Sequence, residues 1–151
     1  FISKNIFLHT DTRKKIIYKI RIDKKYKIIK KENFLKFTKK YGSPDGMTLD
    51  NKKNLWVCFY RGACIRIYNM KGKEIHMINL PAKNITSLCF VGNKKDQLFI
   101  TSAKVDTNKA DLKKYPNCGD TFIIQTNYKG FRINDFDETN IKKLKLLHRQ
   151  H

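Results

Sequence analysis

Short apolar stretches that alternate with polar turns dominate this sequence, and they recur at a nearly constant spacing. The tripeptides at 6–8, 55–57 and 98–100 are each followed by a turn and a second apolar stretch, and their starts are 49 and 43 residues apart. Alternation of apolar and polar residues predicts β-strands. A repeat of roughly 40–50 residues with about four strands is typical of a β-propeller blade. We therefore predict an all-β fold, a β-propeller with about three blades in this chain.

The local pattern agrees with this fold. Ile16, Tyr18, Ile20 and Ile22 share one face of a predicted strand, with Lys19 and Arg21 on the other, as expected for a strand with one buried face. A single stretch, residues 108–115, has a helical pattern. The predicted strands are residues 6–9, 16–22, 26–37, 47–49, 55–60, 63–68, 74–80, 86–91, 98–101 and 121–126.

The length limits what these strands can form. The chain has 151 residues, and propellers usually close with four or more blades. Three blades would leave two sheet faces open, and the first residue is Phe1 rather than Met. We therefore expect a fragment of a probable six-bladed propeller, with partial propeller blades over residues 1–136 and a basic C-terminal tail over residues 137–151.

The formal net charge is +20, from 33 basic and 13 acidic residues. Only 6 of the basic residues are arginine, the residue that forms paired hydrogen bonds with phosphate and guanine. The lysines occur largely in pairs between predicted strands, where charged residues are usually solvated. We therefore expect no nucleic acid as partner, and we keep a polyanion-binding β-domain as a third alternative. No apolar stretch reaches the roughly 18 residues of a membrane-spanning helix, so we expect no membrane partner.

The four cysteines do not have the spacing of a zinc site. Cys58 and Cys64 lie on either side of the Arg61-Gly62 turn, and no CxxC motif occurs. Cys58 and Cys89 lie within predicted strands, where a free cysteine acts as a small apolar residue. Reduced thiols are expected, and they favour a cytoplasmic location.

The most distinctive motif is Pro44-Asp45-Gly46, directly before the predicted strand at 47–49. Taken alone, the motif predicts a turn. In a propeller, however, the first strand of each blade lines the central channel, so an aspartate at the start of that strand would lie at the channel mouth. A carboxylate there can hold a hard cation or act as a base. Asp45 is therefore the candidate for both roles.

The motifs, in their order, resemble the senescence marker protein/regucalcin/gluconolactonase family. The sequence Pro-Asp-Gly-Met-Thr-Leu-Asp at 44–50, followed by Leu-Trp-Val at 55–57, carries most of the resemblance. Gly92-Asn93 and Asp120 depart from the glycines usual in the family. The resemblance covers residues from about 6 to 136, with further matching segments at 61–68, 74–81, 86–90, 98–103, 119–122 and 129–131.

This resemblance implies a six-bladed propeller that hydrolyses sugar lactones with one divalent metal at the channel entrance. It implies that Asp45 is a metal ligand and also the proton donor and acceptor. Ca²⁺ is the expected metal, with Zn²⁺ or Mg²⁺ as alternatives. The other family ligands, a Glu and an Asn, would lie before Phe1. We therefore expect this chain to be inactive without the missing N-terminal blades of the same protein.

Other polar residues are weaker candidates. Thr86 and Ser87 begin a predicted inner strand and Tyr60 ends another, so all three are candidates for lining the pocket, although packing roles are favoured. Asp11 and Asp50 are predicted to stabilise turns or blades. Two functions from different classes remain: the C-terminal half of a metal-dependent sugar lactonase, or a non-catalytic calcium-binding or protein-interaction propeller.

Overall fold

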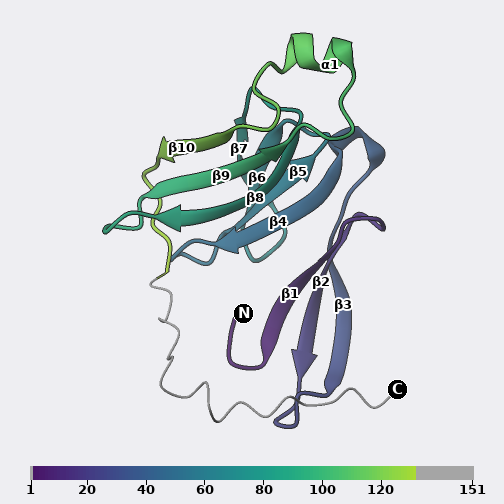
Figure 1. The fold of residues 1–151 in the computed structure, drawn as a ribbon. Coiled ribbons are helices and arrows are strands. Elements are labelled where there is room, and N and C mark those ends of the chain that lie inside the picture. The colour runs from purple at the N-terminus through teal and green to yellow at the C-terminus, as the bar shows by residue number, and fades with distance from the viewer. Residues whose placement is uncertain (1, 132–151) are drawn as a thin grey trace, which may run out of the picture.

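The structure, a computed structural model, describes residues 2–131. Over that range the chain forms three antiparallel sheets and one short α-helix (Figure 1). The sheet orders are β1-β2-β3, β4-β5-β6-β7 and β10-β9-β8. The strands are β1 (Ile6–Asp11), β2 (Ile16–Ile22), β3 (Ile28–Lys36), β4 (Ser43–Leu49), β5 (Leu55–Tyr60), β6 (Cys64–Tyr68), β7 (Glu74–Asn79), β8 (Asn84–Val91), β9 (Gln97–Ala103) and β10 (Thr121–Gln125); the helices are the 3-10 helix η1 (Lys39–Tyr41) and α1 (Lys109–Lys114).

The all-β propeller fold and the strand repeat are confirmed. The three repeated tripeptides lie on β1, β5 and β9, and each of these strands pairs with the next strand in sequence. The predicted helix is α1, whose N-cap Asn108 forms a reciprocal capping box with Asp111. The predicted tail, residues 137–151, lies outside the described residues. Within residues 2–131, no helix is long and apolar enough to span a membrane.

One local prediction was wrong. Pro44-Asp45-Gly46 does not form a free turn but belongs to β4, which begins at Ser43. The motif is accommodated in the strand by a bulge, because the register shifts between Pro44 and Met47. Turn-forming residues thus mark an irregularity within a strand here, which is a usual place for glycine in a sheet.

Strands β5 and β6 of the middle sheet are buried on both faces, whereas its edge strand β7 is exposed. Trp56 and Cys58 of β5 pack toward the β8–β10 sheet, whereas Val57 and Phe59 pack toward the β1–β3 sheet. The Trp56 ring meets the Phe90 ring edge-on, with the ring centroids 5.2 Å apart. This arrangement explains why the sequence of β5 is continuously apolar rather than alternating.

Cys89 departs from its expected place. It is exposed, whereas Cys58, Cys64 and Cys118 are buried, and all four are free. The cause is the alternation along β8, where Leu88 and Phe90 face the middle sheet and Cys89 lies on the opposite face.

The turn between β4 and β5 is organised by Asp50, which is fully buried. Its Oδ1 accepts hydrogen bonds from the backbone amides of Lys52 (2.9 Å) and Asn54 (2.8 Å). Its Oδ2 accepts from the Asn54 side chain (2.8 Å) and from the Trp56 indole (3.1 Å). The predicted blade-stabilising role of Asp50 is therefore confirmed. Asp11 also caps a turn, because its Oδ1 accepts from the Lys14 amide at 3.0 Å.

We expect Asp50→Ala to lower the free energy of unfolding by about 3 kcal/mol, because it leaves the buried Trp56 indole N–H and two turn amides without acceptors. Asp23→Ala is the matched control. Asp23 accepts the same two turn amides, from Lys25 and Lys27, but it has no indole donor, and its loss should cost about 1 kcal/mol. Urea unfolding measures both variants, and equal losses would contradict a special role for Asp50.

Candidate functional site

Asp45 lies in the bulge of β4. Pro44 pairs with Phe59 and Met47 pairs with Val57, so Asp45 and Gly46 together oppose the single residue Cys58. A bulge places one extra residue in the strand and reorients the side chains there, and bulges are frequent beside functional sites. The local sequence explains it, since Pro44 cannot donate a backbone hydrogen bond to the ladder.

A second bulge occurs at the equivalent place in β8. Ile85 pairs with Ser102 and Ser87 pairs with Thr101, which leaves Thr86 as the extra residue. The Thr86 hydroxyl lies 2.8 Å from the Thr101 hydroxyl. Strands β4 and β8 thus have the same irregularity, one extra residue in the strand, at Asp45-Gly46 and at Thr86.

The two bulges touch at Gly46. A Cβ atom on Gly46 would lie 2.6 Å from the Thr86 carbonyl oxygen and 2.8 Å from the Ser87 Cα. Both contacts are with backbone and are far too short for any side chain. Gly46 is therefore required by close approach of β4 and β8, and this approach brings the Asp45 bulge beside Thr86 and Ser87; whether these two residues line a pocket stays a prediction.

Tyr60 lies at the same end of the sheet but is already engaged. Its hydroxyl donates to Asp106 Oδ2 at 3.0 Å, and the Arg61 guanidinium lies 3.4 Å from the same oxygen. Burial and the hydrogen bond to Asp106 raise the pKa of Tyr60, and the charge of Asp45 adds to the increase. Asp45 and Tyr60 therefore share one electrostatic environment; whether Tyr60 lines a pocket stays a prediction.

Asn84 is a residue that the sequence analysis missed. It is fully buried; its side chain accepts from the Arg61 amide at 3.1 Å and donates to the Val105 carbonyl at 2.7 Å. It thereby fixes the β9–α1 connection, which carries Asp106, against the β5–β6 turn. Its position two residues before the predicted strand at 86–91 gave little signal; in the structure Asn84 begins β8 as Ser43 begins β4.

Burial raises the pKa of the Asp45 carboxyl, and the Gly46 backbone amide only partly offsets the increase. Burial is the main cause of the raised pKa of the Cys58 thiol, and the negative charge of Asp45 raises it further. This thiol is therefore unreactive at neutral pH. Within residues 2–131, Asp45 has no ion pair or side-chain hydrogen-bond donor. A partly buried carboxylate in this state suits a hard cation, because the cation would offset the cost of desolvation.

The described residues do not assemble a cluster of metal-binding side chains around Asp45. No group of three or more His, Cys, Asp or Glu side chains in residues 2–131 could hold a metal ion. Asp45 fits the role of one ligand, but one carboxylate does not provide the six to eight oxygens that Ca²⁺ takes.

A cavity of about 360 Å³ lies elsewhere, between β1, β4 and β8. None of Asp45, Tyr60, Thr86 and Ser87 lines it. Its lining is mostly apolar and consists of Ile2, Leu8, Met47, Thr48, Leu49, Leu55, Cys89, Phe90, Gly130 and Phe131.

The raised pKa of Asp45 has a testable consequence for stability. The ionised carboxylate destabilises the folded state, so its cost is absent below the ordinary pKa of 3.8 and appears as the pH rises through the higher folded pKa. We expect Asp45→Asn to raise the free energy of unfolding at neutral pH and to have no effect below pH 3.8.

The control variant is expected to change the free energy of unfolding in the opposite direction. The hydrogen bond from Lys83 lowers the pKa of Asp111, so Asp111→Asn should destabilise the protein at neutral pH and lose its effect as the pH falls. Denaturant unfolding between pH 3 and 8, a range that spans the usual Asp pKa, compares the two. An Asp45→Asn variant that is less stable at neutral pH would show that the carboxylate has a stabilising partner.

Comparison with known proteins gives the family. The model of the SMP-30/gluconolactonase/LRE-like region matches residues 3–104. Regucalcin from Danio rerio is 43% identical over 90 residues, which cover 59% of this chain and 30% of that protein. Pentonolactonase XacC from Haloferax volcanii is 30% identical over 101 residues, which cover 66% of this chain and 35% of that protein.

Solved structures support the fold. A calcium-binding protein, regucalcin, from Agrobacterium tumefaciens superposes with a TM-score of 0.76 at 23% identity, over 84% of this chain and 43% of that chain. The chain spans between 30% and 45% of the length of the curated relatives that it matches. The match over residues 3–104 covers more than half of the chain, and the chain belongs to the SMP-30/gluconolactonase/LRE-like family.

Proposed function

We propose that this chain is the C-terminal half of a metal-dependent sugar lactonase, with Asp45 as one metal ligand and as the group that transfers the proton. The observation that carries the proposal is the partly buried Asp45 carboxylate, which sits in a strand bulge and has no cation partner among residues 2–131. The name of the Haloferax volcanii relative, a pentonolactonase, supports the substrate class.

The chemistry follows from what the carboxylate can do. Opening a lactone ring requires water to add to the ester carbonyl and a proton to reach the departing ring oxygen. A bound divalent cation, most suitably Ca²⁺, would supply charge stabilisation at the carbonyl oxygen. A carboxylate at this position can accept a proton from the attacking water and return it to the departing ring oxygen.

Neighbouring residues would shape the site without taking part in the reaction. Gly46 holds the bulge against β8, and this contact fixes the position of Asp45. Thr86 and Ser87 lie beside the bulge, where their hydroxyl groups could contact a sugar. The Asn84 and Asp106 contacts fix the rim that includes Tyr60.

The Agrobacterium tumefaciens relative, described as a calcium-binding protein, supports the second candidate, a non-catalytic calcium-binding propeller. The two functions share the metal and differ in turnover, so titration calorimetry with Ca²⁺ and a lactone assay distinguish them. Calcium binding without hydrolysis of any sugar lactone would favour the second candidate.

We expect Asp45→Asn, in the protein that contains this chain, to reduce lactone hydrolysis by at least about 100-fold, the usual contribution of a positioned acid–base group. Asp11→Asn removes the same charge at a solvent-exposed turn and should leave activity unchanged. Hydrolysis of gluconolactone and of pentonolactones, followed with and without a chelator, is the measurement. Retained activity in Asp45→Asn would overturn the assigned roles.

A further inference from the structure

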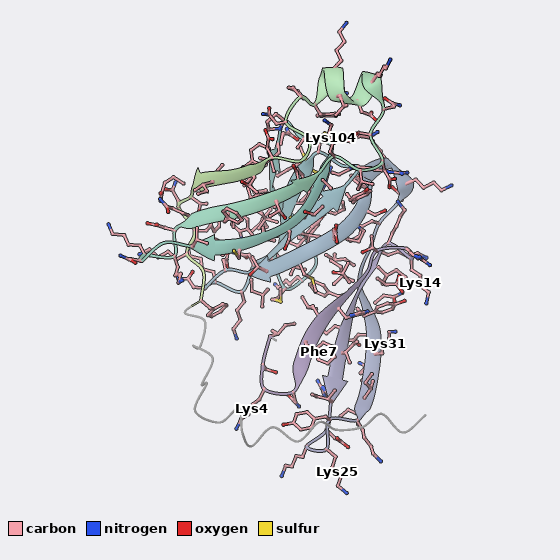
Figure 2. All side chains as sticks on the ribbon, viewed as in Figure 1. Lys4, Phe7, Lys14, Lys25, Lys31 and Lys104 are labelled. Atoms are coloured by element: carbon pink, nitrogen blue, oxygen red, sulfur yellow. The ribbon has the colours of Figure 1, made fainter. Side chains whose placement is uncertain are left out.

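The turn between β2 and β3 exposes apolar and basic side chains together. Residues 24–31, called here the hairpin tip, have the sequence Lys-Lys-Tyr-Lys-Ile-Ile-Lys-Lys, and all eight are exposed. The exposed fractions are 82% for Tyr26, 61% for Ile28 and 59% for Ile29. Figure 2 places Lys25 at the end of the β1–β3 sheet that points away from the other two sheets. Val105 and Ile123 are equally exposed singly elsewhere, but a cluster of exposed apolar side chains is the feature that marks an interaction site.

The backbone at Tyr26 adds a second observation. Three turns in the chain share one design, in which an Asp or Asn side chain accepts the amides two and four residues later, starting at Asp23, Asp50 and Asn69. The third residue after each has a positive φ: 61° at Tyr26, 64° at Lys53 and 81° at Gly72. A bulky aromatic residue is unfavourable in this left-handed conformation, whereas glycine is not.

Tyr26 is therefore strained and receives no compensation within the described structure. Among residues 2–131 its side chain makes no hydrogen bond, ring contact or cation contact. Glycine at this position would relieve the strain, as at Gly72; Lys53 has the same conformation in the third turn, and Tyr26 is the aromatic member of the seven non-glycine residues with positive φ that the described structure contains. Backbone strain without a structural benefit is a reason to look for a function of the side chain.

The charge of the hairpin tip is mostly unpaired. Asp23 is occupied with the turn amides, and Glu32 pairs with Lys30 at 2.6 Å. Lys31 lies over the Tyr18 ring, 4.0 Å from its centroid. The remaining three lysines, Lys24, Lys25 and Lys27, have no acidic partner among the residues that the structure describes.

The position of the hairpin keeps it accessible. β3 is an edge strand of its sheet, as β7 is of the middle sheet. The β6–β7 turn, which has the same design, buries part of Met70 against the core, whereas the β2–β3 turn projects Tyr26 outward. A register shift between Arg21 and Ile22 places an extra residue, Ile29, opposite Ile22, and both Ile28 and Ile29 remain exposed.

We propose that the hairpin tip is a peripheral membrane-binding site for anionic lipid surfaces. Lysines attract the negative headgroups, and the exposed tyrosine and isoleucines enter the interfacial layer, where tyrosine is favoured. Nucleic acid fits this surface less well, because the hairpin tip itself contains no arginine, the nearest being the exposed Arg21 opposite Lys30, and two of the three exposed apolar side chains are aliphatic and cannot stack on bases. This site needs no membrane-spanning helix, so it qualifies the sequence-based expectation of no membrane partner.

Co-sedimentation of the full chain with phosphatidylcholine vesicles, with or without phosphatidylserine, tests the proposal. We expect binding only with phosphatidylserine, and weaker binding at high salt. Tyr26→Gly should weaken binding about tenfold while leaving the fold intact, because it relieves the strained backbone. Lys24→Gln/Lys27→Gln should weaken binding about thirtyfold.

The matched control is Lys71→Gln/Lys73→Gln, which removes the same charge from the equivalent β6–β7 turn and should change binding much less. Circular dichroism and thermal melting confirm that each variant is folded. Equal losses in both double variants would overturn the proposal, since they would show a general charge effect. So would unchanged binding in Tyr26→Gly, or stronger binding to a single-stranded oligonucleotide that the vesicles do not displace.

Discussion

The structure depends on burying β5 and β6 of the middle sheet on both faces. β5 has apolar residues pointing both ways, with Trp56 packed against Phe90 on one side and Phe59 against Phe37 on the other. A sheet of this composition is stable only between two neighbours. The β1–β3 and β8–β10 sheets meet that need, and this packing is what makes the three sheets blades rather than separate hairpins. The same requirement positions β4 against β8, and hence Asp45 beside Thr86.

Much of this architecture was predictable, because it rests on periodicity. The ten strands and the helix were expected close to their observed places, apart from the start of β4 at Ser43, since each has local alternation, a short apolar run or a capping residue. Asp50 was also expected to stabilise its blade. The bulges at Asp45 and Thr86 were not predicted, because the register shifts that define them depend on how β4 and β8 pair with their neighbouring strands. The exposure of Cys89 was missed because the sequence of β8 shows which residues alternate, but not which face of the strand a neighbouring sheet covers.

The candidate site was predictable only in part. Asp45 was identified from a motif and a resemblance, and its bulge, its desolvation and its proximity to Tyr60 give that residue a physical setting. Asn84 and Asp106 were missed because their roles depend on tertiary contacts. Asn84 links the β5–β6 turn to the β9–α1 connection, and Asp106 accepts hydrogen bonds from Tyr60 and Arg61 of a different blade. A single sequence holds no direct signal for contacts of that kind.

The repeated bulge suggests how a symmetrical scaffold becomes a specific site. β4 and β8 carry the same irregularity at equivalent positions, but one presents a carboxylate and the other a hydroxyl. The backbone bulge is the same in both strands, whereas the side chain at the bulge differs between the two blades. A site of this kind collects one or two groups from each inner strand, so no single blade holds it. Within residues 2–131 no group of three or more His, Cys, Asp or Glu side chains could hold a metal ion, so the metal site proposed at Asp45 would need ligands from other blades.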